Sequence, residues 1–274
     1  MLTIESSVEL ANGVRMPRFG LGVWRSQPGA ETERAVAAAL RHGYRLVDTA
    51  ALYGNEADVG RAVRASGIPR EQIFITTKVW NDDHGYDNTK RAFHASLDRL
   101  GMDYVDLYLI HWPVPARGLF KETYRAIEDL YEEGLVRAIG VSNFKVRHLE
   151  ELMTSCRIKP MVNQIELHPL LTQRETVEFC QKEGIQIESW SPIMRGKLDL
   201  PLLHELAAKY GKTPAQIVIR WHLQHGYVVI PKSVREERIA ENSRVFDFEL
   251  SGEDMRRIDG LNEDRRFGRD PDDV

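Results

Sequence analysis

The chain has 274 residues, 42% of them hydrophobic and 28% charged, and this composition excludes an intrinsically disordered chain. Its 37 basic and 41 acidic residues give a formal net charge of −4, so there is no overall basic field to attract nucleic acid. Cys156 and Cys180 are too few for a disulfide framework, they lack metal-ligand spacing, and no apolar run approaches the ~20 residues of a membrane helix. The N-terminus lacks a signal-peptide pattern, so we expect a cytoplasmic protein with reduced thiols and with no metal, nucleic-acid partner or membrane attachment.

The N-terminus carries the pattern of a β-hairpin. Two short runs, 8–10 and 14–16, flank Asn12 and Gly13, a pair that tolerates the positive φ angles of a tight turn.

After the hairpin, short β-rich runs alternate with segments of helical periodicity, several of which end in glycine, as at Gly101 and Gly184. Eight strands are predicted, at 19–23, 45–49, 73–79, 105–110, 136–141, 161–166, 185–190 and 227–230. Such an alternation predicts parallel strands joined by crossover helices.

Two architectures fit this alternation, a (β/α)₈ TIM barrel and a doubly wound open sheet. No G-x-G-x-x-G motif follows the first strand, although most dinucleotide-binding open sheets carry one. Polar residues follow many of the strands, which is typical of barrels, because their active sites lie at the carboxyl ends of the strands. No linker composition interrupts the chain. We therefore predict an α/β protein in which one (β/α)₈ TIM barrel domain spans residues 1–274 and the hairpin caps its bottom.

Four residues suited to proton transfer lie at the ends of three successive predicted strands. Asp48 ends the second strand, with Tyr53 five residues later, Lys78 ends the third, and His111 follows the fourth. A tyrosine with a pKa near ~10 donates a proton poorly at neutral pH, and a neighbouring cation lowers that pKa. Asp48 would hold Lys78 in place, and His111 would orient a carbonyl oxygen. Each residue alone also fits an ordinary structural role, but four such types at adjacent strand ends favour a catalytic site.

Three longer motifs make the chain similar to the aldo-keto reductases along nearly its whole length. They are G-Y-R-L-V-D-T-A at 43–50 with Glu56 and Gly60, R-A-I-G-V-S-N-F at 137–144, and I-P-K-S-V-R-E-E-R-I-A-E-N at 230–242. The bacterial branch is the most similar, namely the diketogluconate reductases and the Bacillus-type glyoxal and methylglyoxal reductases. The resemblance implies a barrel that reduces carbonyl groups with NADPH. It also implies that Tyr53 is the general acid of a catalytic tetrad: Asp48, Tyr53, Lys78 and His111.

The resemblance further implies the residues that bind the nicotinamide half of the cofactor. Ser142, Asn143 and Gln164 would hold the carboxamide, Trp190 would stack on the ring, and Ser191 would contact the pyrophosphate.

The third motif suits the adenosine phosphate end of the cofactor. Ser233 fits a helix N-cap with Glu236 as its capping-box partner, and a helix N-terminus can hold a phosphate. Basic side chains nearby would also attract a phosphate. The alternative interpretation of this segment is a solvated basic patch without a ligand. The resemblance implies that Lys232, Ser233, Val234 and Arg238 bind the 2′-phosphate of NADPH and that Glu241 and Asn242 hold the adenine.

Three tryptophans, Trp24, Trp80 and Trp112, follow strands one, three and four, and with His111 they match the substrate pocket of the family. The loops after strands four and seven are short, which predicts a shallow, open pocket. The resemblance implies that its substrates are small aldehydes, α-dicarbonyls or keto-sugars. The charged segment 263–274 is either disordered or folded back over the pocket.

Two other functions remain open from the residues alone. One is a Schiff-base lyase that uses Lys78, and the three motifs argue against it. The other is an NADPH-binding sensor or interaction protein with little turnover, and the complete tetrad argues against it. We expect a monomer, which is the commonest state in the family.

Overall fold

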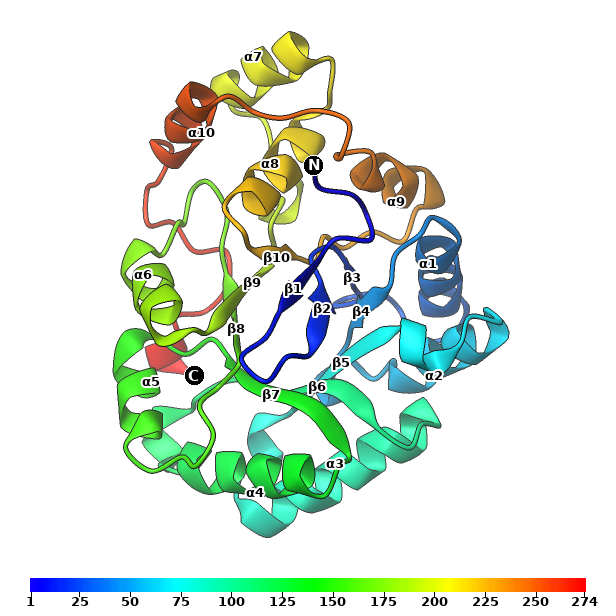
Figure 1. Ribbon diagram of the computed structural model, residues 1–274, viewed down its shortest axis with the longest axis vertical. Coiled ribbons are helices and arrows are strands. Elements are labelled where there is room, and N and C mark those ends of the chain that lie inside the picture. The colour runs from blue at the N-terminus through cyan, green and yellow to red at the C-terminus, as the bar shows by residue number, and fades with distance from the viewer.

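Eight parallel strands lie side by side in the computed structural model, which describes residues 1–274, in the order β10-β9-β8-β7-β6-β5-β4-β3 (Figure 1). A parallel bridge between Phe19 and Val229 joins the two ends of this sheet, and the amide of Gly20 donates to the carbonyl of Val229 at 3.0 Å. The sheet is therefore closed, and the predicted barrel is confirmed.

All eight predicted strands are present. They are β3 (Leu21–Gly22), β4 (Leu46–Asp48), β5 (Phe74–Val79), β6 (Val105–Ile110), β7 (Val136–Ser142), β8 (Val162–Glu166), β9 (Gln186–Trp190) and β10 (Val228–Val229). The first and last strands are shorter than predicted, and they meet at the seam of the barrel. There, Gly22 lies so close to the carbonyl oxygen of Ile230 that a Cβ would be 2.9 Å from it.

Ten helices surround the barrel (Figure 1). They are α1 (Ala30–Arg41), α2 (Glu56–Ala65), α3 (Tyr86–Leu100), α4 (Phe120–Glu132), α5 (Val146–Met153), α6 (Arg174–Glu183), α7 (Pro201–Tyr210), α8 (Pro214–Gln224), α9 (Glu236–Ser243) and α10 (Gly252–Asp259). Helices α3 and α6 end at Gly101 and Gly184 in the left-handed conformation, as the sequence predicts.

Two residues of the first family motif serve the packing of these helices. Gly60 in α2 lies against the end of α3, where an added Cβ would overlap the carbonyl oxygen of Leu100. Glu56, also in α2, is buried and accepts hydrogen bonds from Thr77 of β5 and Arg99 of α3, at 2.5 and 2.7 Å. Glu56 therefore ties two helices to the barrel.

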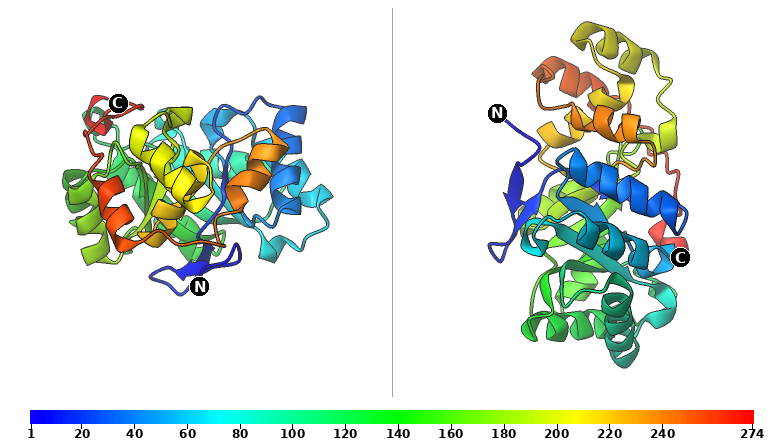
Figure 2. Two further views of the ribbon diagram at one scale, coloured as in Figure 1. Left: turned by 90° about the horizontal axis from the view of Figure 1, so that it is seen from above. Right: turned by 90° about the vertical axis from the view of Figure 1, so that its right-hand side faces the viewer.

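The N-terminal hairpin lies across one end of the barrel, and the C-terminus lies at the opposite end (Figures 1 and 2). Strands β1 (Ser7–Glu9) and β2 (Arg15–Pro17) pair antiparallel, and Gly13 completes the turn between them with φ +85°. Met16 and Leu10 are buried in the core, so the hairpin closes the barrel bottom as predicted.

A continuous core of 65 buried apolar residues fills the barrel and the space between strands and helices. Charged and amide side chains interrupt it along β4, β5, β8 and β9, where Asp48, Lys78, Gln164 and Glu188 are buried. Because such groups are costly to bury, they point to a functional site. None of the helices combines the length and the apolar character needed to cross a membrane.

Candidate active site

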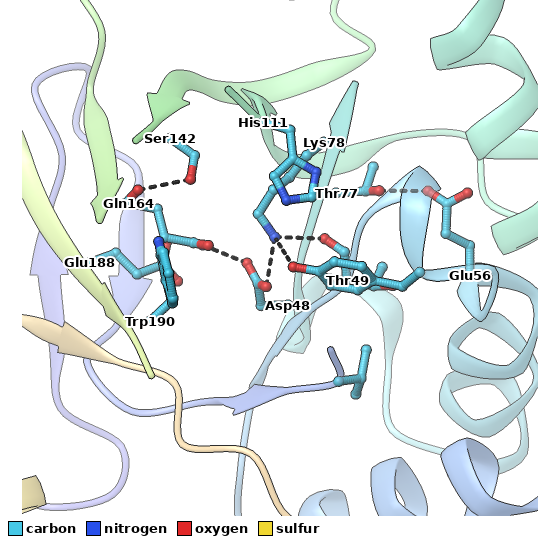
Figure 3. Close-up of polar contacts among 12 residues, drawn as sticks. Asp48, Thr49, Glu56, Thr77, Lys78, His111, Ser142, Gln164, Glu188 and Trp190 are labelled. Carbon is cyan, nitrogen blue, oxygen red and sulfur yellow. Dashed lines mark hydrogen bonds and ion pairs between the residues drawn. The ribbon is translucent and has the colours of Figure 1, made fainter. Parts of the chain in front are cut away.

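The four predicted catalytic residues come from neighbouring elements at one end of the barrel. Figure 3 shows three of them, Asp48, Lys78 and His111. Asp48 ends β4, and Tyr53 ends the 3-10 turn η1 (Ala51–Tyr53) that follows. Lys78 lies near the end of β5, and His111 directly follows β6. Strands β4, β5 and β6 pair in parallel, so residues near their carboxyl ends lie close together in space although they are far apart in the chain.

The ammonium group of Lys78 is completely buried and has three acceptors. Its Nζ lies 2.7 Å from Asp48 Oδ1 and 2.9 Å from the carbonyl oxygen of Thr49 (Figure 3). It also lies 3.4 Å from the hydroxyl of Tyr53. A lysine ammonium has three N–H donors and no acceptor, so the Tyr53 oxygen accepts from Lys78. The phenolic proton of Tyr53 is therefore free to be donated to a different partner.

Burial controls the protonation of Tyr53 more strongly than the sequence indicated. Burial raises the pKa of Tyr53 to about 12, although Lys78 acts in the opposite direction and Asp48 and Glu188 add to the rise. The expected lowering by the neighbouring cation is thus present but outweighed. Tyr53 is protonated at neutral pH, as a proton donor must be.

Lys78 and His111 are held in opposite charge states. Burial lowers the pKa of Lys78, but Asp48 and Tyr53 outweigh burial, so the pKa lies above its ordinary value and the ammonium persists. Burial, with Lys78 and His84, lowers the pKa of His111 well below its ordinary value. The imidazole of His111 is therefore neutral, with one nitrogen available as a donor.

The predicted aromatic wall is present in part around His111. The ring of Trp80 meets the imidazole edge-on at 5.2 Å, Tyr53 does so at 5.7 Å, and Trp112 stacks parallel to it at 6.5 Å.

Trp24 has a different setting from the other two tryptophans. Two guanidinium groups lie over its ring, that of Arg25 at 4.3 Å and that of Arg195 at 5.1 Å from the ring centre. Sequence reasoning missed both arginines, which have positive φ angles of 59° and 54°. The sequence does not predict these conformations, because glycine is the residue that normally adopts positive φ and neither residue is a glycine.

The residues predicted for the nicotinamide half form one network next to the tetrad. Trp190 Nε1 donates to Asn143 Oδ1 at 2.9 Å, and Asn143 Nδ2 donates to the carbonyl of His111 at 2.9 Å. Ser142 Oγ donates to the carbonyl of Gln164 at 2.8 Å, and Gln164 Nε2 donates to Asp48 Oδ2 at 2.7 Å. Ser191 follows Trp190 with φ 49°.

The residues predicted for the adenosine phosphate end line a cavity of about 440 Å³. Five of the six predicted residues line it, namely Lys232, Ser233, Arg238, Glu241 and Asn242, while Val234 packs against the core. The side chains of Lys232 and Arg238 are exposed and form no ion pair.

The predicted capping box at Ser233 is wrong. Helix α9 begins two residues later than that prediction requires, with Arg235 as its N-cap. The Ser233 hydroxyl accepts from the backbone amide of Arg235 at 3.2 Å, so it stabilises the turn before the helix. Glu236 pairs instead with Arg41 and His42 of the neighbouring α1 end, contacts that no local pattern indicates.

The charged C-terminal segment folds back onto the mouth of the barrel. The backbone amides of Phe267 and Gly268 donate to the buried carboxylate of Glu166 at 2.7 and 2.9 Å. Gly268 lies so close to Trp190 that an added Cβ would overlap the ring. Lys145, just before α5, pairs with Asp270 at 2.5 Å and also contacts Asp272. Of the two alternatives that the sequence left open, the structure adopts the ordered one.

Comparison with known proteins agrees with this geometry. The model of the aldo/keto reductase family matches residues 18–263. An uncharacterized oxidoreductase, YtbE, of Bacillus subtilis is 57% identical over 98% of this chain and 97% of its own length. A glyoxal reductase of Bacillus subtilis is 54% identical over 99% of this chain and 98% of its own length.

A solved structure extends the agreement to three dimensions. A variant of Gox0644, crystallised in complex with NADPH, has a TM-score of 0.94 and 46% identity, covering 98% of both chains. The chain therefore belongs to the aldo/keto reductase family and is an enzyme of the oxidoreductase class.

Proposed function

We propose that this chain reduces the carbonyl group of small aldehydes, α-dicarbonyls or keto-sugars to alcohols with NADPH, and that Tyr53 is the general acid. The observation that carries the proposal is the set of three acceptors around Lys78 Nζ. Since the Tyr53 oxygen is one of them, its own proton is directed to another partner, and a substrate carbonyl oxygen suits that position.

The remaining tetrad residues support proton donation by Tyr53. As the proton leaves, Lys78 stabilises the developing phenolate, at a distance of 3.4 Å from the oxygen. Asp48 keeps Lys78 charged and in place at 2.7 Å. The neutral imidazole of His111 donates a hydrogen bond to the same carbonyl oxygen and orients it between two donors.

The residues present fit NADPH. When bound, NADPH supplies the hydride that adds to the carbonyl carbon. Lys232 and Arg238 line a cavity of about 440 Å³ without carboxylate partners, which suits the 2′-phosphate, with Ser233 and Val234 beside it. Glu241 and Asn242 would contact the adenine, and Ser191 the pyrophosphate. The other predicted contacts are to the nicotinamide: Ser142, Asn143, Gln164 and Trp190.

Small substrates fit the aromatic mouth of the barrel. Trp24, Trp80 and Trp112 are half-buried, so each leaves part of its ring to contact a substrate. The 54% identity with a glyoxal reductase supports an α-dicarbonyl as the first substrate to test.

We further propose that residues 1–274 act as one monomeric domain in the cytoplasm. The free thiols of Cys156 and Cys180 support a reducing compartment.

Loss of NADPH absorbance with methylglyoxal, glyoxal and 4-nitrobenzaldehyde tests the proposal, on the wild type and on Tyr53→Phe, with NADH as a second cofactor. We expect turnover by the wild type with NADPH, and a loss of turnover in Tyr53→Phe that leaves NADPH affinity within about twofold. A wild type that binds NADPH but reduces none of these carbonyls would contradict the enzymatic assignment. Equal turnover by both proteins would contradict the role of Tyr53.

A further inference from the structure

A second carboxylate lies inside the barrel beside the tetrad, and the proposed mechanism does not use it. Glu188 is in the middle of β9, paired in register with Gln164 of β8, and it is completely buried. Its Oε2 accepts from Gln164 Nε2 at 2.9 Å, and its Oε1 has no protein partner. Figure 3 shows Glu188 beside Gln164, in the same group of side chains as Asp48.

Gln164 links the two carboxylates. Its amide nitrogen donates to Asp48 Oδ2 at 2.7 Å and to Glu188 Oε2 at 2.9 Å. A side-chain amide nitrogen has two donors, so both are committed. The amide nitrogen rather than the oxygen faces Asp48, because a carbonyl oxygen there would be repelled by the carboxylate that pairs with Lys78. Gln164 Oε1 is left as an acceptor without a protein partner, which suits the N–H₂ group of a nicotinamide carboxamide.

The charges in this part of the barrel do not balance when every group is ionised. The titratable groups that face Glu188 are Asp48 from β4, Tyr53 from η1 and Lys78 from β5. Lys78 is the one cation among them, and it already pairs with Asp48. Two buried carboxylates beside one cation favour a bound proton on one of them.

We propose that Glu188 is a positioning residue of the reduction: it carries this proton and, together with Asp48, locks the Gln164 amide with its oxygen toward the nicotinamide. The inference about the cofactor and Tyr53 rests on the proposed function, whereas the bound proton does not. Burial and the charge of Asp48 raise the pKa of Glu188 to about 8, in agreement with this arrangement.

The bound proton is tested on the protein without cofactor or substrate. Between its ordinary pKa of 4.5 and about 8, unfolded Glu188 releases a proton that folded Glu188 keeps, so its contribution to stability falls as pH rises. Glu188→Gln should therefore unfold at a higher temperature than the wild type above pH ~8, and this gain should vanish below pH ~4.5. The infrared carbonyl band of a protonated carboxylic acid at neutral pH should also disappear in Glu188→Gln.

Glu166→Gln is the matched control for this measurement. Glu166 is equally buried on the neighbouring strand, but His168 and the amides of Phe267 and Gly268 outweigh burial, so its pKa lies below the ordinary value. Its contribution to stability is present above the ordinary pKa and is lost as pH falls. Glu166→Gln should therefore unfold at a lower temperature than the wild type at neutral pH, which is the opposite sign.

The positioning of Gln164 is tested by NADPH affinity, from the quenching of tryptophan fluorescence. Glu188→Leu removes the acceptor for the Gln164 amide and should weaken NADPH binding about tenfold. Glu188→Gln keeps an acceptor oxygen and should bind NADPH within about twofold of the wild type.

The pH profile of the reduction provides a kinetic test. Ionised Glu188 raises the pKa of Tyr53, so Glu188→Gln should move the alkaline limb of kcat to lower pH. A merely structural role would lower stability without moving this limb.

The outcomes separate the inference from the proposed function. A Glu188→Gln variant with the wild-type infrared spectrum and the wild-type pH dependence of stability would overturn the bound proton, even if Glu188→Leu failed to fold. Unchanged NADPH affinity in a folded Glu188→Leu would overturn the locking of Gln164. A wild type that reduces no carbonyl, but in which Glu188→Gln gains stability at alkaline pH, would reject the proposed function and retain the proton on Glu188.

Discussion

Two ion-pair networks lie at the mouth of this barrel, one in its interior and one on its surface. Inside, Lys78 and Asp48 have side chains that are 0% and 3% exposed. At the surface, Lys145 and Asp270 hold the C-terminal segment with side chains that are 27% and 36% exposed. The separations of 2.7 and 2.5 Å are similar, so distance alone does not distinguish the two pairs.

The difference between the two pairs is the solvent. Water and salt screen the surface pair, and such pairs typically contribute about 0.2–1 kcal/mol. Neither charge inside the barrel can be solvated, so removing one partner typically costs about 3–5 kcal/mol. The interior network thus fixes charge states and geometry, whereas the surface network only holds a segment in position.

The largest expected effect is on activity, in Lys78→Met. At an effective dielectric constant of ~20, a charge about 4 Å away contributes about 4 kcal/mol to a phenolate, or about a thousandfold in rate. We expect kcat to fall by about this factor, measured as NADPH consumption with glyoxal. Lys90→Met, which breaks the surface pair between Lys90 of α3 and Glu133 at the end of α4, is the matched control and should retain wild-type kcat.

The next effect is on stability, in Asp48→Asn. The substitution leaves the Lys78 ammonium buried without its counter-charge and should lower the free energy of unfolding by about 3–5 kcal/mol in urea denaturation. The double variant Asp48→Asn with Lys78→Met should lose less than the sum of the two single losses, because no unpaired charge remains. Additive losses would mean that the pair is not energetically coupled.

A smaller effect is expected where the surface segment contacts the mouth. In Gly268→Ala, the added methyl group overlaps the ring of Trp190, so either the ring or the segment must move. We expect a loss of about 1–3 kcal/mol in stability, together with altered tryptophan fluorescence. Gly252→Ala, where the nearest atom is 3.6 Å away at the tip of Arg256, should change neither quantity.

The smallest effect is expected for the surface pair itself. Lys145→Ala should cost about 0.2–1 kcal/mol at low salt. The cost should fade near 1 M salt, where the screening length is about 3 Å. Limited proteolysis after Arg266 or Arg269 would report release of the segment. A cost that persisted in high salt would show that Lys145 acts through packing rather than charge.

The sequence predicted the barrel, and the convergence of the candidate site residues at one end of it, because both follow from local patterns. Strand runs alternate with helical runs, and parallel strands bring their carboxyl ends together. Asp48 ends a strand, Lys78 lies near the end of the next, and His111 follows a third, so their convergence required only the correct fold. The three motifs then indicated the family.

The sequence alone did not decide features that depend on contacts between distant segments. The N-cap of α9 is Arg235 rather than the predicted Ser233, and Glu236 pairs with Arg41 and His42, nearly two hundred positions earlier in the chain. The C-terminal segment could have been free, and its order depends on Glu166, about a hundred residues away.

What the sequence by itself determined is the order of the elements and the types of residue at the strand ends, since these follow from periodicity and spacing. Only the tertiary structure decided how charge is distributed among them. Burial raised the pKa of Tyr53 against the effect of Lys78, and the register of β8 with β9 brought Glu188 to Gln164. The pKa of Tyr53 depends on the exclusion of water by the fold, and the contact of Glu188 with Gln164 depends on the pairing of strands that are separate in the chain. A local sequence pattern predicts neither of them.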